Sequence, residues 1–247
     1  MKLLLLAHER VGERVLHFLL DKHRSDVALV VATEDNRILA AAKQAELPSC
    51  IFHGAQQLAE FIQRECLEFD LGLLAWWPTL VQSPLISLPR SGFINFHPSL
   101  LPHNRGKHYN FWAIVEEAPF GVSLHFVDEG VDSGDVVAQR EIPYHWTDTG
   151  ESLYLRAQEE IVRLFCESYP ILRSLKIPRK RQDLAKGSFH KAAELEPASH
   201  IDLNAPYTAR QLLNLLRART FPGHPGCRFE DQGTKYEVRI DIRSVSE

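Results

Sequence analysis

The sequence is poor in sulfur: its 247 residues include four cysteines and a single methionine. The cysteines are Cys50, Cys66, Cys166 and Cys227. They lie far apart, without the close pairs that bind zinc or the dense framework that holds a small secreted protein together. We therefore expect reduced thiols, as in a cytoplasmic protein, and no catalytic thiol.

Long hydrophobic runs are also missing. The apolar start, residues 3–7, is too short for the core of a signal peptide and continues directly into His8, Glu9 and Arg10. Elsewhere the apolar stretches are too short to span a bilayer. The sequence therefore predicts no membrane partner and a cytoplasmic location.

The chain has no excess of positive charge. It carries 28 Lys and Arg against 32 Asp and Glu, a formal net charge of -4. Proteins that bind nucleic acid through its phosphates usually present a basic field, so nucleic acid is not an expected partner. The short basic run at residues 178–183 predicts an exposed linker instead.

Two common functional motifs are absent. The loop at residues 8–12 leads into a helix start, where an anion can bind, but it has no Gly-x-Gly-x-x-Gly fingerprint. Arg10 stays a candidate diphosphate contact, although solvated turn charges explain this loop more simply. His97, His103 and His108 lack the His-Glu-x-x-His spacing or paired cysteines of a zinc site, so we expect no metal.

What the chain does have is a regular alternation of apolar strands and amphipathic helices. This order is typical of an α/β protein with a mostly parallel, doubly wound sheet, a Rossmann-like fold. The expected strands are residues 2–7, 27–32, 49–52, 69–78, 93–97, 120–127 and 135–142, and the expected helices are residues 11–20, 37–45, 56–66 and 150–175.

We divide the chain at residue 180. Residues 181–247 form a small appendage with a helix at 209–217 and a β-hairpin around the turn at 231–234. The hairpin strands carry apolar positions that need a partner surface, so we expect a homodimer formed through the appendage. These positions are Phe229, Tyr236, Val238 and Ile240.

The most informative strand is residues 93–97, Phe-Ile-Asn-Phe-His, which ends at Pro98. Alternate residues of a strand share a face, so Asn95 and His97 point to the same side. An amide and an imidazole delivered together can stabilise negative charge on a carbonyl oxygen under attack. The alternative is that both are ordinary capped residues at a strand end.

A glycine-rich acidic loop follows the strand at 120–127. It can bring a carboxylate back to the imidazole of His97, and it offers Asp128, Glu129, Asp132 and Asp135. Spacing alone does not choose among them.

A polar and basic cluster lies just after the Asn95 and His97 pair. Its members are Asn104, Arg105, Lys107 and His108. Such side chains suit phosphate or sugar hydroxyl groups. The alternative is a solvated helix start.

These residues together resemble the folate-dependent formyltransferases. The matching motifs are Asn-x-His-x-Ser-Leu-Leu-Pro at 95–102, Arg-Gly at 105–106 and Asp-x-Gly-x-Asp-x-Gly at 128–134. In that family the Asn, the His and the second Asp form the catalytic triad, which the resemblance assigns to Asn95, His97 and Asp132. Residues 104–112 are similar more narrowly to nucleotide-sugar N-formyltransferases of bacterial surface-glycan synthesis, such as O-antigen and lipopolysaccharide. Those proteins usually have proline where this chain has Tyr109.

The resemblance also implies two ligand sites. The donor, 10-formyltetrahydrofolate, would be held by backbone groups of the loop after residues 69–75 and by the acidic loop, through Leu74, Ala75, Trp76, Trp77, Asp128, Gly130 and Val131. Paired tryptophans are otherwise more typical of a core. The acceptor would meet Arg10, Ser99, Asn104, Arg105, Lys107, His108 and Phe221.

The implied reaction is formyl transfer to the primary amine of a nucleotide-linked amino-deoxysugar, with a dTDP-linked 4-amino or 3-amino sugar as the leading acceptor. Methionyl-tRNA formyltransferases share the motif but carry a basic carboxyl-terminal domain, whereas residues 181–247 hold ten basic and nine acidic residues. The remaining alternatives are a formyltransferase for another small amine, a 10-formyltetrahydrofolate hydrolase and a non-catalytic nucleotide-sugar binding protein.

Overall fold

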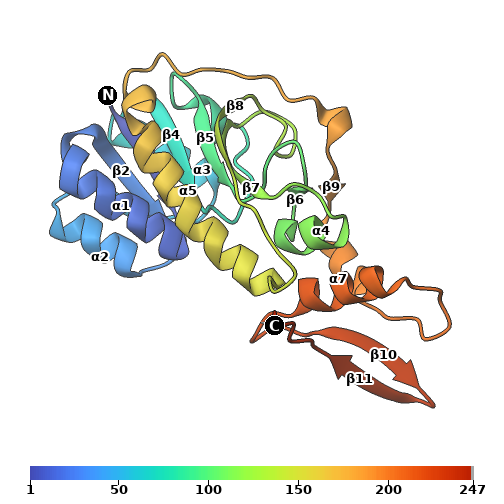
Figure 1. The fold of residues 1–247 in the computed structure, drawn as a ribbon. Coiled ribbons are helices and arrows are strands. Elements are labelled where there is room, and N and C mark those ends of the chain that lie inside the picture. The colour runs from blue at the N-terminus through green and yellow to red at the C-terminus, as the bar shows by residue number, and fades with distance from the viewer. Residues whose placement is uncertain (246–247) are drawn as a thin grey trace. The chain divides into compact units, whose positions relative to one another are not determined.

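The structure, a computed structural model, describes residues 1–245 (Figure 1). Its strands are β1 Leu3–Ala7, β2 Val27–Ala32, β3 Ser49–Ile51, β4 Leu71–Ala75, β5 Phe93–His97, β6 Arg105–Gly106, β7 Gly121–Phe126, β8 Val136–Glu141, β9 Phe189–His190, β10 Cys227–Asp231 and β11 Thr234–Val238. Its α-helices are α1 Glu9–His23, α2 Arg37–Gln44, α3 Ala55–Arg64, α4 Tyr109–Val115, α5 Gly150–Arg173, α6 Leu195–Ala198 and α7 Ala209–Arg219.

A seven-stranded sheet forms the centre of the fold, in the order β3-β2-β1-β4-β5-β7-β8. The pairs β2–β3, β1–β2, β1–β4 and β4–β5 are parallel, and β5 pairs with β7 in the antiparallel sense. The expected mostly parallel, Rossmann-like sheet is therefore confirmed. Because the parallel strands share a direction, their carboxyl ends meet at one edge, where ligands bind in such sheets.

Helices cover both faces of the sheet. Strand β1 is fully buried along its length, as its continuous apolar run requires. Leu4 and Leu6 belong to a core cluster that contains Leu58 and Ile62 of α3, so the alternate residues of β1 face the other side of the sheet. On the α1 and α5 side, Phe165 packs against Phe18 and Phe96, with ring centroids 5.7 and 5.0 Å apart.

Local sequence signals explain where several helices begin. Asn36 accepts hydrogen bonds from the backbone N–H groups of Ile38 and Leu39 at 3.0 and 3.3 Å and so caps α2. Thr208 and Gln211 form a capping box at the start of α7. Within residues 1–245, we find no helix whose length and apolar content would let it cross a membrane.

The backbone contacts divide the chain into two compact units. Unit 1 comprises Met1–His97, Ser123–Gln139 and Gln158–Gln182, and unit 2 comprises Pro98–Val122, Arg140–Ala157 and Asp183–Glu247. The last change of unit falls two residues after our sequence-based division at residue 180. Unit 2 also includes two earlier segments of the chain, Pro98–Val122 and Arg140–Ala157. A single boundary in the sequence therefore does not separate the two units.

The predicted hairpin is present, with β10 and β11 paired in the antiparallel sense around the turn after Asp231. The sequence did not predict the two-residue strands β6 and β9, which pair in parallel. Strands this short have no periodicity to detect.

Candidate active site

Strand β5 presents Asn95 and His97 at the carboxyl edge of the sheet, as the alternation of its residues predicted. In the antiparallel register with β7, Asn95 lies opposite His125 and His97 lies opposite Ser123. The ring of His97 is buried, with 6% of its side chain exposed. Both polar groups are thus held on a strand rather than on a mobile loop end.

The acidic loop brings Asp132, among its several carboxylates, to this pair. Asp132 Oδ1 lies 3.4 Å from His97 Nδ1, and Asn95 Nδ2 donates to the same oxygen at 3.4 Å. Asp128 instead accepts hydrogen bonds inside the loop, from the backbone of Gly130 at 3.1 Å and from Ser133 Oγ at 2.8 Å. The structure therefore separates the two carboxylates that the sequence spacing left equivalent.

Two features hold the loop in place. The side-chain amide of Gln182 donates to the backbone oxygens of Asp132 and Gly134 at 2.9 and 2.7 Å. A Cβ added at Gly134 would lie 1.9 Å from the backbone oxygen of Phe126, so a side chain cannot be accommodated there without backbone movement. Asp132 adopts a left-handed backbone conformation, with φ of 51°. Strained backbone of this kind often accompanies function.

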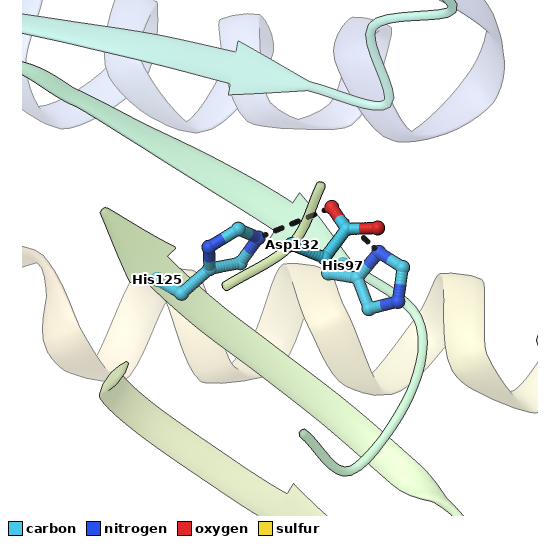
Figure 2. A group of neighbouring side chains, drawn as sticks. All are labelled: His97, His125 and Asp132. Atoms are coloured by element: carbon cyan, nitrogen blue, oxygen red, sulfur yellow. Dashed lines mark ion pairs between the residues drawn. The ribbon is translucent and has the colours of Figure 1, made fainter. Parts of the chain in front are cut away.

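The sequence analysis missed a fourth member of the cluster, His125. Its Nδ1 lies 2.8 Å from the backbone oxygen of Phe126, an acceptor only, so Nδ1 carries the hydrogen. In the neutral ring Nε2 is then an acceptor, and it lies 3.1 Å from Asn95 Nδ2 and 3.6 Å from Asp132 Oδ1. Figure 2 shows the Asp132 carboxylate between the rings of His125 and His97. The signal that could have identified His125 was the strand register, because His125 alternates with Ser123 on β7, the strand that pairs beside Asn95.

His97, His125 and Asp132 each offer one ligand atom, all within 4.8 Å of one another. Two imidazoles and a carboxylate are a donor set that suits a divalent transition metal. The sequence argument against a metal considered His97 with His103 and His108 and did not include His125 or Asp132. The hydrogen bonds of Asn95 and the Asp132 carboxylate account for the same short distances without an ion, so metal independence stays a prediction.

The candidate donor loop begins beside this cluster, because Leu74 of β4 is the parallel partner of Asn95. The side chains of Leu74, Ala75 and Trp77 are buried, and Trp77 packs edge-on against Phe52 at 5.2 Å. Trp76 is partly exposed and has a positive φ of 63°. The side chains of Leu74, Ala75 and Trp77 thus lie in the core, and contact with a folate through their backbone groups stays a prediction.

Arg10 lies at the start of α1, on a cavity of about 660 Å³ in unit 1. Glu159 binds both Arg10, at 2.9 Å, and Arg14, at 2.6 Å. His8 at the same cavity contacts the Thr33 hydroxyl at 3.0 Å. The cavity thus holds charges of both signs, and Arg10 keeps 62% of its side chain exposed.

The predicted acceptor cluster lies in unit 2, and its members differ in exposure. Asn104 is buried, and its amide donates to Glu116 at 2.9 Å and to Ser188 at 3.2 Å. Ser99 is also buried and donates to the backbone oxygen of His103 at 2.7 Å. These two residues support the local fold.

Lys107 is exposed, whereas Arg105 and His108 are partly buried. Burial lowers the pKa of His108, and the neighbouring charges of Arg219 and Lys107 lower it further. Burial is the main cause of this shift, and the two cations add to it. Phe221, also in unit 2, packs edge-on against Tyr154 and His224, with ring centroids 5.5 and 4.8 Å apart.

Comparison with known proteins places these residues in a family. Residues 2–168 match the family model described as formyl transferase, and residues 194–244 match the N-formyltransferase dimerization C-terminal domain. A curated relative, the dTDP-4-amino-4,6-dideoxyglucose formyltransferase of Mycobacterium tuberculosis, is 29% identical over 187 residues, which are 75% of this chain and 77% of the relative.

Two solved structures extend the comparison. A likely sugar N-formyltransferase from Mycobacterium tuberculosis has a TM-score of 0.82 at 24% identity, with 100% of this chain and 99% of that chain covered. A formyltransferase from Anoxybacillus kamchatkensis, solved with UDP-4,6-dideoxy-4-formamido-L-AltNAc and tetrahydrofolate, has a TM-score of 0.58 at 26% identity, with 80% of this chain and 89% of that chain covered. With its first 168 residues matched almost completely, and with Asn95, His97 and Asp132 gathered at the carboxyl edge of the sheet, the chain belongs to the formyl transferase family.

Proposed function

We propose that this protein transfers the formyl group of 10-formyltetrahydrofolate to the primary amine of a nucleotide-linked amino-deoxysugar, with a dTDP-linked 4-amino or 3-amino sugar as acceptor. The observation that carries the proposal is the cluster of Asn95, His97 and Asp132 in a chain of this family. The names of the relatives support the substrate class: one acts on a dTDP-amino sugar, and another was solved with a formylated UDP-sugar and a folate.

The mechanism we propose follows from where charge develops. A neutral amine attacks the formyl carbon, and negative charge grows on the formyl oxygen. Asn95 and His97 donate hydrogen bonds to that oxygen and lower the barrier. Asp132 holds His97 in its donor form. The nitrogen of the intermediate is acidic, and Asp132 and His97 relay its proton to the departing folate nitrogen. Every step uses side chains of this chain, so the proposal needs no metal.

The ligand contacts are part of the same proposal. Arg105, Lys107 and His108, with Arg10 as a further candidate, are the cations we assign to the diphosphate, and Phe221 is the aromatic side chain we assign to the acceptor. Backbone groups from Leu74 to Trp77 and the loop at 128–131 are assigned to the folate. The protein would work in the cytoplasm as a homodimer, in the synthesis of a bacterial surface glycan.

The first test is a direct assay. The purified protein is incubated with 10-formyltetrahydrofolate and dTDP-4-amino-4,6-dideoxyglucose, and the N-formyl product is identified by mass spectrometry. Asp132→Asn should lower kcat by about 10² to 10⁴, because a proton relay contributes that much, while folate binding survives. Asn95→Ala and His97→Asn should be impaired to a similar extent, and pretreatment with EDTA should change nothing. Formate release without an acceptor would indicate a hydrolase, and near wild-type turnover of Asp132→Asn would refute the triad.

The second test concerns the acceptor. Arg105→Ala or Lys107→Ala should raise KM for the nucleotide sugar more than KM for the folate, because a phosphate contact is lost. Equal effects on both constants would show that these side chains shape the site in general. An acceptor that is not a nucleotide sugar would leave both variants at wild-type KM.

A further inference from the structure

Residues 188–194, which we call the strap, lie directly beside the loop that carries Arg105 and Lys107. The backbone N–H of Arg105 donates to Ser188 O, and that of Lys107 donates to His190 O, both at 3.0 Å. These bonds form the parallel pair β6–β9, visible where the two labels meet in Figure 1. The strap and the loop are parts of the same unit although they are about 80 residues apart in the chain.

The approach of strap to loop is close. Gly106 has a φ of +90°, and a Cβ added there would lie 2.2 Å from the backbone oxygen of His190. Arg105 lies over the ring of Phe189, with its guanidinium carbon 5.9 Å from the ring centroid. The strap therefore sets the backbone of Gly106 and covers one side of Arg105.

His190 fastens the strap through both ring nitrogens. Nε2 lies 2.8 Å from Glu116 Oε1, and Nδ1 lies 3.1 Å from Glu194 Oε2. The ring also stacks on Trp112, with centroids 3.8 Å apart and planes inclined by 8°. Its side chain is only 11% exposed. Carboxylates only accept hydrogen bonds, so both contacts are made at once only when both ring nitrogens carry hydrogen.

Glu116 links the ring to the loop. Its Oε2 accepts from Asn104 Nδ2 at 2.9 Å and from Ser188 Oγ at 2.8 Å, in addition to the His190 contact on Oε1. The pKa of Glu194 is lowered by the backbone N–H of Lys191 and then by His190, so Glu194 stays charged. The charged groups in contact with the ring are thus Glu116, from the end of α4, and Glu194, with Lys191 beside Glu194.

We propose that His190 is a positioning residue for the acceptor: its clamp between Glu116 and Glu194 holds the strap, and the strap holds Arg105 and Lys107 ready for a diphosphate. This rests on the proposed function of those two cations. A loop ordered before the ligand arrives does not have to be ordered by binding, so affinity rises. Loss of either ring contact removes one of the two carboxylate bonds and loosens the clamp.

The test uses His190→Gln in the full-length protein. We expect KM for the nucleotide sugar to rise by about 10-fold, with kcat and KM for the folate changed by less than about 2-fold. Backbone amide exchange of residues 104–107 should become faster. His200→Gln, an exposed histidine of the same unit, is the matched control.

Trp112→Phe keeps an aromatic face against the ring of His190, so its KM for the nucleotide sugar should stay close to that of the wild type. It is a second, milder variant at the clamp in case His190→Gln fails to fold. The proposal is overturned if His190→Gln leaves KM for the nucleotide sugar unchanged while Arg105→Ala raises it. If the wild-type protein shows no formyl transfer, that result counts against the proposed function and not against the role of His190. The role of the strap would then be tested by the affinity for dTDP alone, measured by calorimetry. An unchanged dTDP affinity of His190→Gln would overturn that role.

Discussion

At the scale of single residues, the hydrogen-bond partners of Asn95 fix the orientation of its amide. His125 Nε2 and Asp132 Oδ1 are both acceptors, at 3.1 and 3.4 Å from Asn95 Nδ2. An amide oxygen facing them would meet two repulsive partners, so the NH₂ group points this way. One N–H donates to His125 Nε2, and the second, held by Asp132 only at the longer distance of 3.4 Å, is the one that we propose turns to the formyl oxygen. The backbone oxygen of Phe126 fixes this arrangement indirectly, because it selects the tautomer of His125.

This argument predicts the effect of removing the acceptor. In His125→Leu the Asn95 amide is free to turn, and kcat should fall by about 10- to 100-fold, less than the full loss of an oxyanion donor. Both KM values should stay within about 2-fold. His125→Gln offers an acceptor oxygen again and should recover part of the rate. Steady-state kinetics on variants with wild-type circular dichroism checks this, and a kcat unaffected in His125→Leu would show that Asn95 is held by other contacts.

At the scale of elements, the acidic loop after β7 is held by side-chain hydrogen bonds to its backbone and by close packing at Gly134. Asp128 organises the turn, Gln182 binds the two carbonyls around Ser133, and Gly134 packs against β7 without room for a side chain. The loop therefore holds Asp132 in a fixed position, and a change at Gly134 should displace the Asp132 carboxylate.

Gly134→Ala tests that rigidity. The added methyl group meets the backbone oxygen of Phe126, which cannot rotate away, so the loop must shift. We expect a loss of about 1 to 3 kcal/mol in the free energy of unfolding and a fall in kcat of more than about 10-fold, because a misplaced catalytic group is costly. Urea unfolding and turnover measure the two effects. An unchanged kcat would mean that Asp132 is positioned independently of this glycine.

At the scale of the whole molecule, the hairpin β10–β11 bears on assembly. Its base is anchored within unit 2, since Cys227 is fully buried and its thiol contacts the backbone oxygen of Leu215. Towards its tip, Phe229 and Tyr236 stack at 5.0 Å, and Tyr236 remains 46% exposed. The apolar face of the hairpin thus extends beyond the part that is anchored in unit 2. It needs a further surface to cover it, which a second copy of the chain would supply.

We therefore expect Tyr236→Lys to shift a dimer towards the monomer in light scattering at micromolar concentration. Removing the chain from Gly226 onward should have the same effect, but it also deletes the buried Cys227, so the point substitution is the cleaner test. Lys235→Glu, which changes a neighbouring exposed residue, is the control. A Tyr236→Lys protein that keeps the dimer mass would place the interface elsewhere.

Stability of the molecule should depend on pH through Asp26. Burial raises the pKa of this carboxyl, but hydrogen bonds from Arg173 and Tyr169 and the charge of Arg173 outweigh it, and the pKa falls below its ordinary value of 3.8. A group with a lowered folded-state pKa stabilises the fold above its unfolded value and loses that contribution as the pH falls. Asp26→Asn should cost about 1 to 3 kcal/mol at pH 7. In urea unfolding the difference from wild type should shrink below pH 3.8, and a constant difference would contradict this origin.

The sequence by itself determined the features that depend on local periodicity. The continuous apolar run of β1, the alternation that puts Asn95 and His97 on one side of β5, and the hairpin turn after Asp231 are all present as predicted. Patterns of this kind are written in residues two to four positions apart, because the geometry of strands and helices repeats over that distance.

Only the tertiary structure decided the contacts between distant segments. It selected Asp132 over Asp128, brought His125 to Asn95, turned Asn104 inward and laid His190 beside the loop of Arg105. Each of these outcomes depends on a strand register or on a loop held by its own hydrogen bonds. A shift of register by one residue would reverse which side chains face the site, and no local pattern of residues encodes that choice.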